Sequence, residues 1–274
     1  MLLLNGKIIE IKEFPNREAK ITDFTCRPDK NTIELKYEDD RDLTRLWFVK
    51  KRIDDLGAEA SLFMWYMPYS RMDRQIEGDL FTLKYICDFL AKLNFKHIVI
   101  LDPHSDATSD LLAEHNLSFS TVRIDWLTQV MANIDFDPKF DAIVLPDKGA
   151  AKRYSHDELE QFKNVCVFDK KRDPITGRIE SIEMIDGHIN PGCKCIIMDD
   201  LCSKGGTFLA TGQILRKSGA SFVALSVTHL EPSVQNGKLL TDESPIDVIY
   251  ASRSMPEVIH DRIKYLEVEV DNYV

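Results

Sequence analysis

The sequence lacks the features of several special classes of protein. It contains no apolar run of the about 20 residues that a transmembrane helix needs, and the opening stretch Met1–Lys7 is too short for a secretory signal peptide. None of its six cysteines belongs to a Cys-x-x-Cys pair, so neither a zinc site nor a disulfide framework is expected. We therefore expect reduced thiols and a cytoplasmic protein.

Positive charge is also scarce. The chain has 35 lysine and arginine residues against 45 aspartate and glutamate residues, and its net charge of −10 argues against a nucleic-acid or anionic-membrane surface. Hydrophobic residues make up an ordinary 44% of the 274 residues. The chain can therefore bury a substantial core, in one large or two modest domains.

Short apolar runs alternate with helical patterns along the chain and predict an α/β fold. Leu80, Leu83, Cys87 and Leu90 mark one face of a helix, and a second helix runs through Leu111. Such alternation indicates mainly parallel sheets flanked by helices. The expected strands are residues 7–11, 19–24, 32–37, 46–49, 62–67, 97–101, 142–145, 164–168, 195–198, 222–227 and 247–251, with a hairpin arm at 178–184.

The polar stretch 133–140 contains a proline and favours a domain boundary. We therefore expect an N-terminal domain of residues 1–135 and a C-terminal domain of residues 136–274. In both halves, polar residues cluster directly after the expected strands. Ligands bind at that edge of open parallel sheets, so these clusters are candidate functional residues.

Residues 195–207 carry the strongest functional pattern. An apolar strand is followed by Asp199 and Asp200, then by a loop with two glycines, and then by a helix that Thr207 can cap. Free backbone N–H groups at such a helix start suit a phosphate, and adjacent carboxylates suit ribose hydroxyls or a magnesium ion. An ordinary connection between a strand and a helix has the same pattern, so this stretch alone leaves both interpretations open.

This stretch resembles the ribose-5-phosphate loop of type I phosphoribosyltransferases and phosphoribosyl pyrophosphate (PRPP) synthetases, in which Asp-Asp precedes Thr-Gly-Gly-Thr. Lys204 replaces the first of those threonines, and Ser203 stands where PRPP synthetases usually carry another aspartate. Five further stretches resemble PRPP synthetase motifs in the family's order, although Asn16 replaces an aspartate and Met72 a glutamine. These stretches are residues 14–18, 67–74, 102–104, 146–153 and 169–172.

The resemblance implies two phosphoribosyltransferase-type α/β domains and a magnesium-dependent diphosphokinase. Such an enzyme transfers the β,γ-diphosphoryl group of ATP to the 1-hydroxyl of a 5-phosphorylated ribose and releases AMP. With ribose 5-phosphate as the acceptor, the product is PRPP for nucleotide biosynthesis. In the family, the N-terminal motif serves a neighbouring subunit, so a homo-oligomer is implied.

The same resemblance implies a role for each matching residue. The catalytic cations would be Lys170 and Arg172, and the magnesium ligands would be His104 and Asp147. The residues implied to bind ATP are Phe14, Asn16, Glu18, Arg71, Asp73 and His104. Those implied to bind the ribose phosphate are Asp199, Asp200, Ser203, Lys204, Gly205, Gly206 and Thr207.

Three alternatives stay open on the sequence. The cation of Lys204 could face a second phosphate, which would make ADP-ribose the acceptor and link the enzyme to NAD metabolism. A phosphoribosyltransferase shares the loop after Asp200 but has no need of Lys170 and Arg172. A non-catalytic regulatory paralogue would be expected to lose those cations, and this chain retains them.

Overall fold

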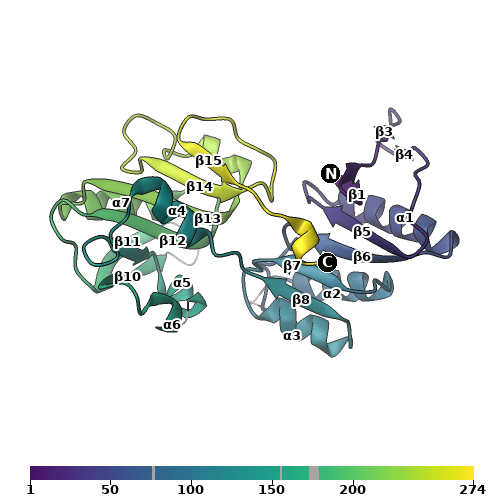
Figure 1. Ribbon diagram of the computed structural model, residues 1–274, viewed down its shortest axis with the longest axis horizontal. Coiled ribbons are helices and arrows are strands. Elements are labelled where there is room, and N and C mark those ends of the chain that lie inside the picture. The colour runs from purple at the N-terminus through teal and green to yellow at the C-terminus, as the bar shows by residue number, and fades with distance from the viewer. Residues whose placement is uncertain (76–77, 155, 173–178) are drawn as a thin grey trace. The chain divides into compact units, whose positions relative to one another are not determined.

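The computed structural model divides the chain into two units, each built on one large sheet (Figure 1). Unit 1 comprises Met1–Ile124 and Val268–Val274, and unit 2 comprises Asp125–Glu267. The residues that the structure describes are 1–75, 78–154, 156–172 and 179–274, with the side chains of residues 172 and 179 outside that description.

The sheet of unit 1 has six strands in the order β2-β1-β5-β6-β7-β8, of which the last four run parallel. Its strands are β1 (Leu2–Leu4), β2 (Lys7–Ile8), β5 (Lys30–Leu35), β6 (Glu59–Met64), β7 (Ile98–Leu101) and β8 (Phe119–Val122). The helices of the unit are α1 (Arg41–Asp55), α2 (Thr82–Lys92), α3 (Ala107–Glu114) and the short 3-10 helix η2 (Val270–Asn272).

Helix α1 replaces the strand that was expected at residues 46–49. Leu46, Val49 and Ile53 are fully buried and lie three and four residues apart, which is the spacing of one helical face. The prediction was wrong because a four-residue apolar run fits a buried strand and a buried helix turn equally well. The other runs expected as strands in unit 1 overlap strands of the structure.

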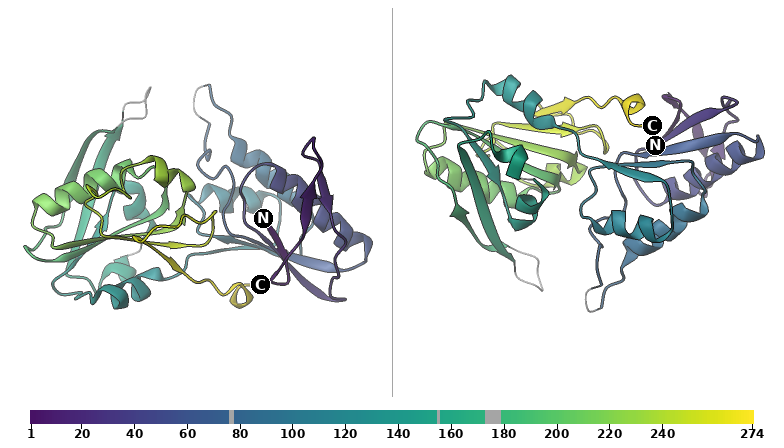
Figure 2. Two further views of the ribbon diagram at one scale, coloured as in Figure 1. Left: turned by 90° about the horizontal axis from the view of Figure 1, so that it is seen from above. Right: turned by 60° about the horizontal axis from the view of Figure 1, so that its bottom comes forward.

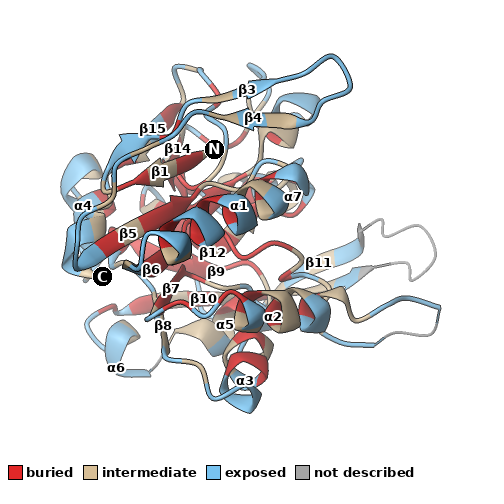
Figure 3. Cartoon of the chain, turned by 90° about the vertical axis from the view of Figure 1, so that its right-hand side faces the viewer, coloured by how far each residue is buried: buried red, intermediate tan, exposed pale blue. Residues whose placement is uncertain are grey.

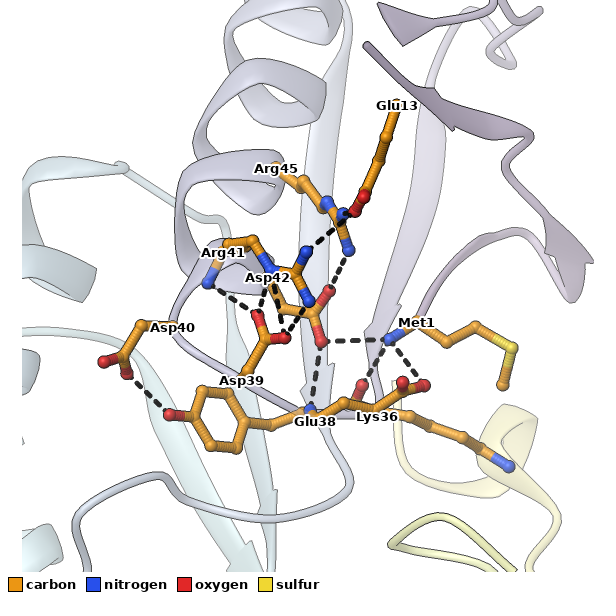
Figure 4. A network of polar contacts seen from close by, with 10 residues as sticks. Met1, Glu13, Lys36, Glu38, Asp39, Asp40, Arg41, Asp42 and Arg45 are labelled. Carbon is orange, nitrogen blue, oxygen red and sulfur yellow. Dashed lines mark hydrogen bonds and ion pairs between the residues drawn. The ribbon is translucent and has the colours of Figure 1, made fainter. Parts of the chain in front are cut away.

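Strands β3 (Ile11–Glu13) and β4 (Ala19–Ile21) pair only with each other in the structure described here and form an arm of unit 1. Glu13, at the end of β3, accepts bonds from Arg41 and Arg45 of α1 (Figure 4). Arg45 also pairs at 3.0 Å with Asp42, which is 2% exposed and lies 3.1 Å from the amino group of Met1. This network ties the arm to the start of α1.

Unit 2 contains a seven-stranded sheet in the order β11-β10-β9-β12-β13-β14-β15, parallel except for β11. Its strands are β9 (Ala142–Leu145), β10 (Asn164–Arg172), β11 (Ile179–Asp186), β12 (Lys194–Cys202), β13 (Phe222–Leu230), β14 (Val248–Ser252) and β15 (Ile263–Leu266). The helices are α4 (Trp126–Ile134), α5 (Lys148–Arg153), α6 (His156–Leu159), α7 (Gly206–Lys217) and the 3-10 helix η1 (Pro232–Asn236).

Two strands of unit 2 are longer than the sequence indicated. β12 continues through Asp199 and Asp200 to Cys202, because β13 continues beside it and pairs Asp199 with Val227. β10 likewise continues through residues 169–172, because the antiparallel strand β11 covers that half of it. Figure 2 shows β10 and β11 as an arm that projects beyond the other strands of their sheet. The expected hairpin arm is therefore present.

The division into units differs from the expected boundary after residue 135. Helix α4 belongs to unit 2, where it contacts β13, and the C-terminal segment returns to unit 1. There Val268, Val270 and Tyr273 pack against a cluster that includes Phe63 and Trp65. The sequence analysis assumed a single domain boundary, and a single boundary cannot describe a unit that is made of two separate segments of the chain.

Buried residues concentrate in the strands and on the inner faces of the helices (Figure 3). All six cysteines are free in the structure. Five of them are buried, and burial raises the pKa of Cys195 and Cys202 well above the usual value for a thiol. No helix among the described residues is long and apolar enough to cross a membrane.

Candidate active site

Strand β9 leads into a carboxylate at the C-terminal edge of the sheet of unit 2. Pro146 and Asp147 follow the strand, and Asp147 is in an extended conformation before α5 begins. Its Oδ1 accepts a hydrogen bond from the backbone N–H of Ala150 at 2.8 Å, so this carboxylate caps α5. The cap fixes the Asp147 side chain beside the ends of the neighbouring strands β10 and β12.

Lys170 supplies a cation at the same place. It lies in the second half of β10, and its Nζ forms an ion pair with Oδ2 of Asp147; the two side chains are 22% and 17% exposed. Burial pushes the pKa of Asp147 upward, but the hydrogen bonds from Lys170 and from the Ala150 N–H outweigh burial and hold that pKa below its usual value. Asp147 therefore stays ionised and keeps the ammonium group of Lys170 at the edge of the sheet.

A second, more exposed ion pair joins the same elements. Nζ of Lys148, the first residue of α5, lies 2.5 Å from Oδ2 of Asp169 in β10. This contact lowers the pKa of Asp169 below its usual value. Arg172 is the last residue of β10, but its side chain lies outside the described residues, so its implied catalytic role stays a prediction.

Asp199 and Asp200 place two carboxylates in the second half of β12. Asp200 is buried, and Nη2 of Arg153 at the end of α5 lies 3.7 Å from its Oδ2. Oδ1 of Asp199 accepts a hydrogen bond from the backbone N–H of Asp200 at 2.9 Å. Burial, the charge of Asp200 and the charge of Asp147 raise the pKa of Asp199 well above its usual value. This concentration of negative charge favours a ligand that brings hydrogen-bond donors or cations.

The turn between β12 and α7 is shaped by two glycines. Gly205 has a φ of +78° and is the N-cap of α7, and a Cβ at this position would lie 2.1 Å from Cδ1 of Leu239. Gly206 is exposed, and a Cβ there would meet no atom within 4 Å. The expectation that Thr207 caps the helix is wrong, because Thr207 already lies inside the first turn. The exposed start of α7 can present backbone N–H groups to a phosphate.

Ser203 and Lys204 lie between the carboxylates and this turn. Oγ of Ser203 lies 3.0 Å from Oγ of Ser233, whose hydroxyl donates to Oε2 of Glu231 at 2.9 Å. Lys204 is exposed, and its ammonium group has no hydrogen bond or ion pair with any residue that the structure describes. The loop therefore offers a hydroxyl in a fixed place and a cation that can move.

The residues implied to bind ATP lie in unit 1. Arg74 bonds to both oxygens of Asp73, at 2.7 and 3.0 Å, and this contact lowers the pKa of Asp73 below its usual value. His104 is exposed in the loop after β7, and Arg71 is exposed beside Met72. Asp102, at the start of the same loop, has a φ of +41°, which is uncommon for a residue other than glycine and often marks a functional loop.

The motif at residues 14–18 forms the tip of the β3–β4 arm. The backbone N–H of Phe14 donates to the carbonyl of Glu18 at 2.9 Å, and Oδ1 of Asn16 accepts from the N–H of Glu18 at 3.2 Å. Arg17 takes the left-handed conformation that closes the turn, with a φ of +69°. The ring of Phe14 is 50% exposed. Binding of adenine by this tip, and its service to a neighbouring subunit, stay predictions.

The structure thus brings the implied residues into three groups. Unit 2 holds the strand-end group and the glycine loop, whereas unit 1 holds the two loops that carry Asp73 and His104, and separately the arm tip. Arg153 matched a family motif, but the sequence suggested no role for it, and the structure places it at Asp200. Ser233 was missed, because no motif or spacing relates residues that lie 30 positions apart.

The carboxylate of Asp147 fits a magnesium site of the kind that nucleotide enzymes use. Magnesium is commonly held by one or two carboxylates together with substrate phosphates and water. The two oxygens of Asp147 have about four lone pairs in all and already accept from Lys170, the Ala150 N–H and the Gly149 N–H, so one more partner can bind. His104 is a less suitable ligand, because magnesium prefers oxygen. No group of three or more metal-binding side chains occurs among the described residues.

No protein-family model matches the sequence. A ribose-phosphate pyrophosphokinase of Mycoplasma genitalium is 31% identical over 208 residues, which cover 74% of this chain and 60% of that protein. The corresponding protein of Sulfolobus acidocaldarius is 26% identical over 227 residues, which cover 81% of this chain and 76% of that protein.

The fold has a solved counterpart. The crystal structure of phosphoribosylpyrophosphate synthetase from Mycobacterium smegmatis matches with a TM-score of 0.75 and 20% identity, over 94% of this chain and 85% of that chain. The sequence relatives and the structural match agree with the motifs read along the chain. The chain is therefore similar in sequence to ribose-phosphate pyrophosphokinases, and it has the α/β fold of phosphoribosylpyrophosphate synthetase.

Proposed function

We propose that the protein is a ribose-phosphate diphosphokinase that uses ATP and magnesium. The contact between Lys170 and Asp147 carries this proposal. It places a cation on Asp147, whose charge acts on Asp199 of the neighbouring strand β12. A site that only binds a ribose phosphate needs the loop and the acids but not this cation.

The proposed reaction moves two phosphates together. The 1-hydroxyl oxygen of the acceptor forms a bond to the β-phosphorus of ATP, the bond from that phosphorus to the α,β-bridging oxygen breaks, the hydroxyl proton is lost, and AMP leaves. Catalysis of such a step comes mostly from positioning and from positive charge around the phosphate oxygens. Bound magnesium would supply part of that positive charge.

In the proposed reaction, the cationic residues would bind phosphates and the carboxylates would bind sugar hydroxyls. Lys170 would meet the phosphates that are being transferred, and Arg172 would join it. Asp199 and Asp200 would accept hydrogen bonds from the ribose hydroxyls, and the backbone at Gly205, Gly206 and Thr207 would hold the 5-phosphate. In unit 1, Arg71, Asp73, His104 and the arm tip would bind ATP.

Two acceptors fit this loop. Ribose 5-phosphate needs only the acids and the glycine turn. ADP-ribose continues from the 5-phosphate into a second phosphate and a nucleoside. Two observations support ADP-ribose as an acceptor: Lys204 is exposed without a described partner, and the space beside Gly206 is open. The product of that reaction would be an ADP-ribose 1-diphosphate, an activated donor for the synthesis of NAD.

We expect turnover to yield AMP and an acceptor that has gained two phosphates. The protein would be incubated with ATP, magnesium and either ribose 5-phosphate or ADP-ribose, and the products identified by mass. EDTA should abolish turnover, because unscreened phosphates repel each other in the transition state. ADP together with an acceptor that has gained a single phosphate would refute diphosphoryl transfer, and release of pyrophosphate from PRPP in the presence of a base would indicate a phosphoribosyltransferase.

Replacing Lys170 by alanine should lower kcat by about 10³-fold and change the KM for ATP much less, because this cation meets charge that develops in the transition state. Lys171→Ala is the matched control, since Lys171 is exposed on the same strand. Steady-state kinetics and circular dichroism would be recorded for both. A Lys170→Ala enzyme with nearly normal kcat would remove Lys170 from the catalytic role.

The choice of acceptor should depend on Lys204. If ADP-ribose is the substrate, Lys204→Thr should lower kcat/KM for ADP-ribose by about tenfold or more and leave that for ribose 5-phosphate nearly unchanged, because a charge-assisted hydrogen bond to the second phosphate is lost. Lys217→Thr, at the far end of α7, is the control. The ADP-ribose alternative fails if the wild type uses ribose 5-phosphate alone, or if Lys204→Thr leaves the preference unchanged.

A further inference from the structure

The segment that follows β13 packs directly behind the glycine loop. The backbone N–H of Glu231 donates to the carbonyl of Cys202 at 2.8 Å. A Cβ on Gly237 would lie 2.0 Å from the carbonyl oxygen of Lys204, so the two backbones are in close contact there. Leu239 closes the other side, against Gly205. Residues 231–239, which we call the loop support, therefore determine where the loop backbone can lie.

One chain of hydrogen bonds runs from the loop support into the loop. An ionised carboxylate can only accept hydrogen bonds, so the hydroxyl proton of Ser233 points to Oε2 of Glu231, at 2.9 Å. The contact of 3.0 Å between the hydroxyl oxygens of Ser233 and Ser203 then needs a proton from Ser203. The carboxylate of Glu231 thus sets the direction of both bonds.

This direction decides what Ser203 can bind. Its one proton is committed to Ser233, and its free lone pairs can only accept a hydrogen bond. A phosphate oxygen is also an acceptor, so it gains nothing from Ser203 in this state. A sugar hydroxyl is a donor, and it can complete the chain.

We propose that Ser233 and Glu231 are positioning residues that make Ser203 an acceptor for a hydroxyl group of the ribosyl substrate. The proposal rests on the proposed function and names a specificity determinant of the same site. The backbone at the start of α7 and the side chain of Lys204 bind the phosphate of that substrate. Ser203 then distinguishes a ribose phosphate from a phosphate group alone.

A double-mutant cycle on Ser203 and Ser233 tests the proposal, with acceptor and ATP kinetics measured for each variant. Ser233→Ala should raise the KM for the acceptor about fivefold, and Ser203→Ala about tenfold, because each loses one hydrogen bond. The double variant should match Ser203→Ala, since Ser233 acts through Ser203. Neither should change the KM for ATP by more than about twofold, and Ser233→Thr, which keeps the hydroxyl, should restore the acceptor KM.

Ser218→Ala is the matched control, because Ser218 is an exposed serine at the other end of α7. Thermal unfolding of each variant shows whether unit 2 stays folded; Ser233 is only partly buried, so its loss should not unfold the unit. An unchanged acceptor KM in Ser233→Ala would overturn the proposal. So would fully additive effects in the double variant, or an equal rise in the KM for ATP.

The proposal and the proposed function fail in different ways. If the wild type turns over neither ribose 5-phosphate nor ADP-ribose, the proposed function fails, and calorimetric binding of ribose 5-phosphate replaces KM in the same cycle. Weaker binding by Ser233→Ala, without further loss in the double variant, would still support the proposal. Absence of any ribose 5-phosphate binding by the wild type would end both.

Discussion

The rest of this site depends on the negative charge of two neighbouring carboxylates on one strand. Asp199 and Asp200 occupy the end of β12, where burial and mutual repulsion raise the pKa of Asp199. Arg153 stands near Asp200, but Asp147 adds further negative charge. The ligand-free protein therefore carries a charge cluster that a hydroxyl-rich or cation-bearing ligand relieves. Charge clusters of this kind are common in binding sites, where pKa values are often perturbed.

Three parts of unit 2 surround these carboxylates: the Asp147–Lys170 pair, the start of α7 and the loop support. Asp147 caps α5 and holds Lys170, so a cation is fixed beside the acids. The start of α7 is left open by Gly206, and the loop support holds the backbone of Lys204 and Gly205 from behind. All of these parts come from the C-terminal edge of one parallel sheet, which is where such sheets bind ligands. The structural match establishes the fold, and the relatives show a sequence similarity to ribose-phosphate pyrophosphokinases, whereas the chemistry proposed here rests on this local arrangement.

Much of this could be read from the sequence, for physical reasons that also explain what could not. Strands β9 and β12 were predicted because buried parallel strands are continuous apolar runs followed by polar residues. The helix at residues 46–49 was mistaken for a strand because so short a run carries no period. Asp199 and Lys170 were expected after their strands but lie within them, since strand length depends on the neighbouring strand and not on the residues themselves. Ser233 reaches Ser203 only through the path of the folded chain, which no local pattern records.

The thermal stability of Asp199→Asn at two pH values tests the central claim most directly. Since the pKa of Asp199 is raised in the folded state, its ionised form destabilises the fold above that pKa, and this cost disappears at low pH, where the carboxyl is protonated in folded and unfolded protein alike. We predict that Asp199→Asn has a higher Tm than the wild type at about pH 8, a gain that shrinks to a small remainder near about pH 4, and that its turnover is lost. The exposed Asp242→Asn serves as the control and should change neither Tm nor turnover. A lower Tm for Asp199→Asn at about pH 8, or the same gain at both pH values, would contradict the account.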